Sequence, residues 1–135
     1  MVTINLEYTD DLRTVATHGP SGTVIQTDAP TDNMGKGEFF SPTDLCATAL
    51  GSCIITTIGI KGLQKGWDLK GSKVRIEKIM SQDTPRRIAQ LNVAVKIPDR
   101  FSDKDKKHML NIAHACPVHK SLHPDVQLNV SLDWV

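Results

Sequence analysis

The chain has 135 residues, a length at which one domain buries roughly two thirds of the surface that its unfolded form exposes. Sixteen basic and fifteen acidic residues give a formal net charge of +1, and no run of Lys or Arg is long enough to follow a phosphate backbone. We therefore expect one domain over residues 1–135 and no nucleic-acid partner.

Alternating apolar residues predict three strands at the start of the chain. Residues 2–8 have the period-two pattern of a half-buried strand, and the weaker strand patterns of residues 12–18 and 23–29 are joined by a Gly-Pro turn. Residues 28–37 are a polar loop of the kind that often carries function. The N-terminus lacks the basic and apolar regions of a secretory signal, so we expect a cytoplasmic protein.

A long helix is expected over residues 42–64. Ser41 is placed to be its N-cap, Pro42 its first residue, and Asp44 the acid of a capping box. Its apolar residues extend around the cylinder, which predicts a helix covered on most sides. Residues 45–60 span about 16 positions against the ~20 that a bilayer core needs, so we expect a buried helix and no membrane.

The second half of the chain predicts a hairpin, a helix and a last strand. Residues 72–80 and 89–98 are the two strands of the hairpin, and a helix is expected over residues 102–115. Residues 126–135 alternate strictly and predict a strand. Strands and helices arrive in runs, which indicates the α+β class with mainly antiparallel sheets.

Three cysteines stand in this pattern, and a buried thiol is by default a small apolar side chain. Pro117 should end the second helix and begin a short one with Cys116 as its N-cap, a setting that lowers the pKa of a thiol. Cys53 stands among apolar residues that would raise its pKa. Cys46 is two helical turns away, about 10.5 Å along the axis, and is interpreted as packing.

Two motifs together resemble one family. "SPTDLCATALGSC", which ends at Cys53, and "ACPVHKSL", which holds Cys116, are similar to the two signatures of the OsmC/Ohr family, the osmotically inducible protein C and organic hydroperoxide resistance proteins. The order of strands and helices is also similar along essentially the whole chain. The resemblance implies antiparallel sheets packed around a long central helix, an intertwined homodimer, and neither a metal nor a bound cofactor.

The implied activity is that of a thiol peroxidase. Cys53 would be the peroxidatic cysteine that forms a sulfenic acid, and Cys116 the resolving cysteine that condenses with it to a disulfide. An external dithiol, usually a lipoyl protein in the family, would reduce that disulfide. The surroundings of Cys53 favour an organic hydroperoxide over hydrogen peroxide as substrate, because Leu50, Ile54, Phe39 and Phe40 could line a dry pocket, although such residues are more often plain core.

The resemblance also implies a cation and a carboxylate at the site. Arg13 is the only arginine before residue 75 and takes the role of the cation, with Lys36 as the next choice. The best-known hydroperoxide reductases carry Glu where this chain has Thr43. Asp44 beside it, or Glu38 upstream, would replace that carboxylate, and Asp44 is equally well explained as a helix cap.

Two other functions remain open on the sequence alone. His114, Cys116, His119 and His123 cluster within ten residues, a pattern compatible with a zinc site, although no C-x-x-C pair accompanies it. The second alternative is a protein without catalysis that keeps the same fold for ligand binding or thiol-dependent sensing.

Overall fold

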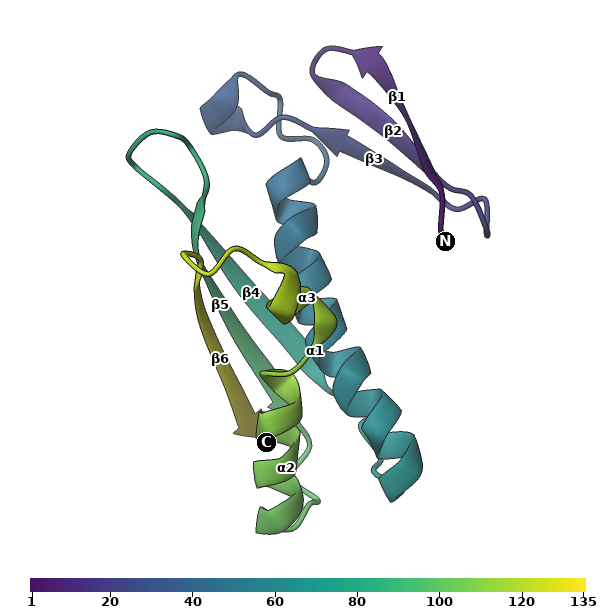
Figure 1. Ribbon diagram of the computed structural model, residues 1–135, viewed down its shortest axis with the longest axis vertical. Coiled ribbons are helices and arrows are strands. Elements are labelled where there is room, and N and C mark those ends of the chain that lie inside the picture. The colour runs from purple at the N-terminus through teal and green to yellow at the C-terminus, as the bar shows by residue number, and fades with distance from the viewer. The chain divides into compact units, whose positions relative to one another are not determined.

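Two three-stranded sheets and one long helix account for most of the chain (Figure 1). The structure is a computed structural model that describes residues 1–135. It divides into two compact units, residues 1–46 and 47–135, which are described separately. The α+β class expected from the sequence is confirmed, and each predicted strand and helix is present close to its expected bounds.

The first unit is an antiparallel meander of β1 (Ile4–Asp10), β2 (Arg13–His18) and β3 (Val24–Asp28). The alternation along β1 predicted a half-buried strand, and this prediction is wrong. Every residue of β1 is exposed, with Ile4 at 58% and Leu6 at 66% of their free accessibility. The pattern identified the strand correctly, but no other element of the first unit covers the face that carries its apolar residues.

A loop then leads to the long helix α1 (Pro42–Lys65) through a single turn of 3-10 helix, η1 (Thr31–Asn33). The backbone N–H of Ser41 donates to Asp44 Oδ2 at 2.9 Å, and the N–H of Asp44 donates to Ser41 Oγ at 3.1 Å. This reciprocal pair is the predicted capping box, and it satisfies two donors that a helix start leaves unpaired.

The sheet of the second unit contains β4 (Lys73–Met80), β5 (Ile88–Ile97) and β6 (Gln127–Trp134). β4 and β5 form the predicted antiparallel hairpin, whereas β6 pairs in parallel with β5. A parallel neighbour requires a long crossover. Here the crossover contains the helices α2 (Asp103–Ala113) and α3 (Pro117–Ser121).

The helices cover one face of this sheet (Figure 1). Alternate residues of β5 point into a core whose largest members are fully buried, while the intervening residues face the other side. At about 25 cal/mol per Å² of apolar surface, these contacts are the main stabilising term of the unit. The core holds Leu50, Ile54 and Ile58 of α1, Leu91, Val93, Val95 and Ile97 of β5, Met109 and Ala113 of α2, and Cys116.

The opposite side of α1 is not covered by the rest of the second unit. By length and composition alone the helix is apolar enough to cross a membrane. It buries one face against the sheet, but Ile60 and Leu63 are 64% and 88% exposed. The expectation of a helix covered on most sides is therefore wrong for the single chain.

Gly51 marks the closest approach of α1 to the sheet. A Cβ at this position would overlap Ile76 Cδ1 and would lie 3.1 Å from Val74 Cγ1. We expect Gly51→Ala to lower the free energy of unfolding by about 1 kcal/mol, because overpacking of ~1–3 kcal/mol exceeds the helix-propensity gain of ~1 kcal/mol. Gly59→Ala is the matched control, since no atom lies within 4 Å of its new Cβ. Urea unfolding measures the free energy of unfolding of both variants, and Gly59→Ala should raise it through helix propensity alone. A Gly51→Ala variant that is stabilised as much as Gly59→Ala would contradict the close packing at Gly51.

Candidate functional site

The second unit brings together the thiols of Cys53 and Cys116. Cys53 lies in the middle of α1 and is half-buried, while Cys116 is the N-cap of α3 and is fully buried. Neither takes part in a disulfide. The sulfurs of Cys53 and Cys116 are near enough for each to shift the pKa of the other. The two cysteines that the sequence motifs singled out are therefore neighbours.

The pKa of Cys53 lies below the usual value of a thiol. Burial acts to raise it, but hydrogen bonds from the backbone N–H of Val118, the thiol of Cys116 and the hydroxyl of Thr57 together outweigh burial and lower the pKa. Donors to a sulfur favour its anionic form. Burial among apolar neighbours acts in the direction expected from the sequence, but that expectation did not include the donors supplied by α3, which reverse the net shift.

Cys116 has the opposite shift. As predicted, its sulfur accepts a hydrogen bond from the backbone N–H of His119, at 3.3 Å. Complete burial nevertheless raises the pKa of the Cys116 thiol, and the nearby sulfur of Cys53 raises it further. The expectation of a lowered pKa at Cys116 is therefore wrong. The cap geometry was foreseen, but the cost of burying a charge exceeds the benefit of the cap.

Thr57, one turn after Cys53, is a contact that the sequence analysis missed. Its Oγ1 lies 3.9 Å from Cys53 Sγ and 2.6 Å from the backbone carbonyl oxygen of Cys53. The single hydroxyl proton can serve either acceptor. The i, i+4 spacing of Cys53 and Thr57 on one helix face was the available signal.

The histidines near Cys116 are not grouped as a set of metal ligands. The rings of His114 and His119 meet edge to face with their centroids 5.8 Å apart, and His123 lies 3.6 Å from Asp125. Burial and the charges of His114 and Lys120 lower the pKa of His119. No group of three or more His, Cys, Asp or Glu residues in the chain is arranged to hold a metal ion, so the zinc alternative has no structural support.

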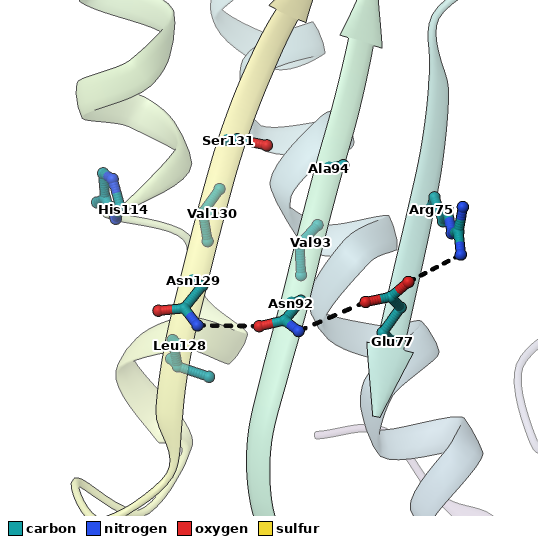
Figure 2. Close-up of a pocket in the computed structure, with 10 residues that line it drawn as sticks. All are labelled: Arg75, Glu77, Asn92, Val93, Ala94, His114, Leu128, Asn129, Val130 and Ser131. Atoms are coloured by element: carbon teal, nitrogen blue, oxygen red, sulfur yellow. Dashed lines mark hydrogen bonds and ion pairs between the residues drawn. The ribbon is translucent and has the colours of Figure 1, made fainter. Parts of the chain in front are cut away.

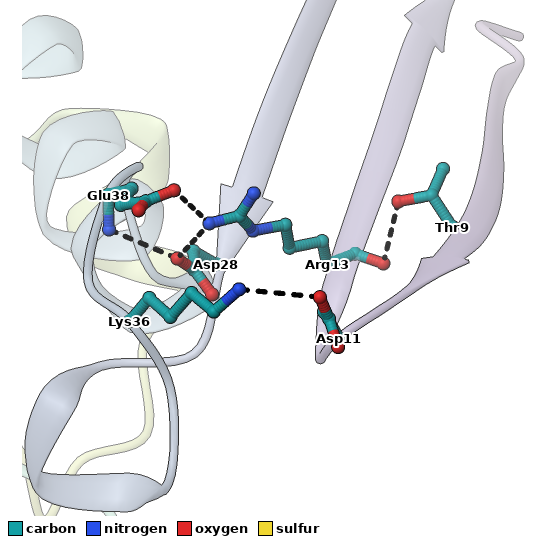
Figure 3. Close-up of polar contacts among 6 residues, drawn as sticks. All are labelled: Thr9, Asp11, Arg13, Asp28, Lys36 and Glu38. Atoms are coloured by element: carbon teal, nitrogen blue, oxygen red, sulfur yellow. Dashed lines mark hydrogen bonds and ion pairs between the residues drawn. The ribbon is translucent and has the colours of Figure 1, made fainter.

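The first unit holds Arg13 in a cluster with two carboxylates (Figure 3). The Nη2 atom of Arg13 donates to Asp28 Oδ2 at 3.3 Å and to Glu38 Oε2. The ring of Phe39 lies 5.3 Å from the guanidinium carbon. Hydrogen bonding to Glu38, followed by the charges of both carboxylates, raises the pKa of Arg13 despite its desolvation.

Asp28 was not found from the sequence, although it directly faces Arg13 in the pairing of β2 with β3. Its side chain is fully buried. A hydrogen bond from the backbone N–H of Glu38, together with the Arg13 charge, holds the pKa of Asp28 below its usual value in spite of burial. Asp28 is therefore ionised at neutral pH. Correct alignment of β2 and β3 would have revealed the pair.

The other charged residues named from the sequence have defined places in the first unit. Asp44 forms the capping box with Ser41, as one of its two interpretations predicted. Lys36 lies 3.4 Å from Asp11 in an exposed ion pair (Figure 3). Of the suggested dry pocket, Leu50 and Ile54 are fully buried core residues of the second unit, while Phe39 and Phe40 are 41% and 57% exposed.

A shallow depression lies on the polar face of the second sheet (Figure 2). Hydrogen bonds cross it from Asn129 Nδ2 to Asn92 Oδ1 at 2.9 Å and from Asn92 Nδ2 to Glu77 at 3.5 Å. Arg75 extends the chain with a 2.8 Å contact to Glu77. No cysteine lines this depression, so it is separate from the thiol pair.

Comparison with known proteins identifies relatives of the whole chain. The family model described as OsmC-like protein matches residues 35–131. No curated protein matches the chain. A crystal structure from Psychrobacter arcticus 273-4, provisionally described as an osmotic stress induced and detoxification response protein, is 45% identical with a TM-score of 0.92. That match covers 98% of this chain and 96% of the other.

More distant solved structures share the fold. An organic hydroperoxide resistance protein OsmC from Legionella pneumophila has a TM-score of 0.74 at 14% identity, over 98% of this chain and 96% of its own. An organic hydroperoxide resistance protein from Elizabethkingia anophelis has a TM-score of 0.79 at 11% identity, over 100% of this chain and 96% of its own. At these identities the likeness concerns the fold alone.

The contribution of Thr57 can be measured directly. Thr57→Val keeps the shape of the side chain and removes its hydroxyl, so the pKa of Cys53 should rise. Alkylation of Cys53 by iodoacetamide at neutral pH should slow by about two- to tenfold, the effect of losing one hydrogen bond. Alkylation rates measured across a range of pH give both the pKa of Cys53 and its rate at neutral pH.

Thr56→Val is the matched control, because the Thr56 hydroxyl donates to the backbone carbonyls of Ser52 and Cys53, at 2.8 and 3.2 Å, rather than to a sulfur. Equal effects of the two substitutions would contradict the role given to Thr57.

Proposed function

The chain belongs to the OsmC-like protein family, and from this premise we propose that it is a thiol-dependent peroxidase that reduces organic hydroperoxides. One observation carries the proposal: Cys53 has a lowered pKa and has a second reduced thiol, Cys116, beside it. A thiolate is the form of cysteine that attacks peroxides, and a neighbouring thiol prevents irreversible oxidation of the product.

In the first step, the thiolate of Cys53 attacks the terminal oxygen of the hydroperoxide. A sulfur–oxygen bond forms while the oxygen–oxygen bond breaks. The alkoxide that leaves takes up a proton and departs as an alcohol. Cys53 is oxidised by two electrons to a sulfenic acid, and the hydroperoxide is reduced by the same two electrons.

In the second step, Cys116 attacks the sulfur of the Cys53 sulfenic acid. A disulfide forms, and the hydroxyl group leaves as water with the thiol proton of Cys116. An external dithiol, for which a lipoyl protein is the expected source, then exchanges with the disulfide and restores both thiols. No bound cofactor or metal is required by this cycle.

Arg13 and Asp44 complete the proposed set of site residues. We assign Arg13 the role of the cation that assists the peroxide reaction, because the resemblance of the chain to its family assigns an arginine of the first strands to that role. Its carboxylate partners in the first unit are Asp28 and Glu38. Asp44 keeps a proposed catalytic role beside its observed role in the capping box.

We also propose that the protein is a homodimer. Two exposed apolar surfaces support this. One is formed by Ile4, Leu6 and Tyr8 of β1, and the other is the uncovered side of α1 at Ile60 and Leu63. Exposed apolar surfaces of this kind mark interaction sites. Sedimentation analysis tests the proposal: a dimer is expected at micromolar concentration, and a monomer that persists there would contradict it.

The peroxidase proposal predicts a distinct outcome for each cysteine. With an added dithiol, the wild-type protein should consume cumene and tert-butyl hydroperoxide faster than hydrogen peroxide. Cys53→Ser should abolish consumption, because the nucleophile is lost. Cys116→Ser should permit one turnover and leave a sulfenic acid on Cys53, detectable by dimedone labelling and mass spectrometry. Cys46→Ser is the matched control and should retain activity.

Two results would contradict the assignment. Wild-type protein that consumes no hydroperoxide with all thiols reduced would favour the ligand-binding or redox-sensing alternative. A stable sulfenic acid found on Cys116 in the Cys53→Ser variant would reverse the roles of the two cysteines.

A further inference from the structure

Asp28 is the most deeply buried charged residue that the proposed cycle does not use. It lies at the end of β3, directly opposite Arg13 of β2, and its side chain is fully buried. Burial of a carboxylate costs several kcal/mol unless it is paired and hydrogen-bonded. A buried ion pair adds little stability compared with apolar residues of the same volume, so its value lies in fixing a geometry.

The contacts of Asp28 fix two neighbouring parts of the first unit at once. Its Oδ2 accepts hydrogen bonds from Arg13 Nη2 at 3.3 Å and from the backbone N–H of Glu38 at 3.0 Å (Figure 3). Its backbone N–H donates to the carbonyl of Phe40 at 3.1 Å. One residue therefore holds both the guanidinium and the segment that carries Glu38 and Phe39.

Two polar atoms of the pair have no partner. Asp28 Oδ1 and Arg13 Nε are both buried without a hydrogen bond. Arg13 also lines a small cleft with Thr14, Gln26 and Phe39. The orientation of the guanidinium therefore decides which of its donors the cleft presents, and Asp28 is the buried group that sets this orientation.

The backbone before Arg13 is held in an unusual conformation. Asp10, Asp11 and Leu12 all have positive φ angles, of 92°, 52° and 61°. Residues with side chains rarely adopt this region, and each costs of the order of 1 kcal/mol. The carbonyl of Leu12 accepts from the N–H of Ala29, next to Asp28, at 3.2 Å. The end of β3 therefore constrains Arg13 twice: Ala29 holds the backbone just before Arg13, and Asp28 holds its guanidinium.

We propose that Asp28 is the positioning residue for Arg13: its buried carboxylate orients the guanidinium and ties the segment at Glu38 and Phe39 around it. This inference rests on the proposed function only for the role of Arg13 in the reaction. Glu38 also accepts from Arg13 and is the largest cause of its raised pKa, but the Glu38 side chain is 58% exposed and its backbone N–H is itself held by Asp28. The orientation is therefore assigned to Asp28.

The Nε–H of Arg13 reports on this orientation without any activity measurement. Because the atom is buried and unpartnered, its proton should exchange slowly with water and give a resolved ¹⁵N NMR signal, assigned by its loss in Arg13→Lys. In Asp28→Asn, which keeps an acceptor for the Glu38 N–H but removes the charge, that exchange should speed up by about tenfold or more.

The kinetic arm of the test is a double-substitution cycle. Asp28→Asn should slow the reaction with cumene hydroperoxide about 10- to 100-fold, the effect of a misplaced catalytic group. In an Arg13→Ala background the same substitution should cause no further loss, because Asp28 acts through Arg13. Asp11→Asn is the matched control: it removes a neighbouring carboxylate that pairs with Lys36, and both readouts should match the wild type.

The outcomes separate this inference from the proposed function. An unchanged Arg13 Nε–H signal in Asp28→Asn would overturn the inference whether or not the protein is a peroxidase. Wild-type protein without peroxidase activity would overturn the proposed function and leave the NMR test valid. If Asp28→Asn does not fold, Asp28→Glu replaces it, because this variant keeps the charge and moves the carboxylate by one methylene. An unshifted Arg13 Nε–H signal in Asp28→Glu would equally overturn the inference.

Discussion

The approach of the first turn of α3 to Cys53 is the constraint on which the thiol site depends, because the backbone N–H of Val118 acts there to lower the pKa of Cys53. Pro117 begins α3, so the N–H groups of Val118 and His119 have no partner within that short helix. The N–H of His119 donates to Cys116 Sγ at 3.3 Å, and the N–H of Val118 contributes to the lowered pKa of Cys53. A local feature of the sequence, a cysteine followed by proline, thereby influences two thiols that are far apart along the chain.

The same arrangement makes the two thiols unequal. Cys53 is half-buried and receives donors from three residues, so its pKa falls, whereas the burial of Cys116 outweighs its donors and its pKa rises. The nearby sulfur of Cys53 contributes to the raised pKa of Cys116. In the proposed cycle, oxidation of Cys53 to a neutral sulfenic acid removes that negative charge. Cys116 would then ionise more readily, so that the resolving step follows the peroxide step.

The sequence was sufficient where the determining contacts are local. The capping box of Ser41 and Asp44 and the cap at Cys116 depend on residues within one turn, and both were predicted. It was insufficient where distant segments meet. The low pKa of Cys53 depends on α3, the pairing of Arg13 with Asp28 depends on strand register, and the parallel pairing of β6 depends on the crossover. The family resemblance implied a thiolate at Cys53, whereas the local sequence pattern alone favoured the lower pKa at Cys116.

The most direct test of the account is the pH dependence of alkylation at each cysteine of the reduced wild-type protein, resolved by peptide mass spectrometry. The account predicts that the Cys53 rate rises and reaches its plateau at a lower pH than the Cys116 rate, because donors favour the thiolate at Cys53 while burial disfavours it at Cys116. A Cys116 thiol that titrates below Cys53 would contradict the central claim.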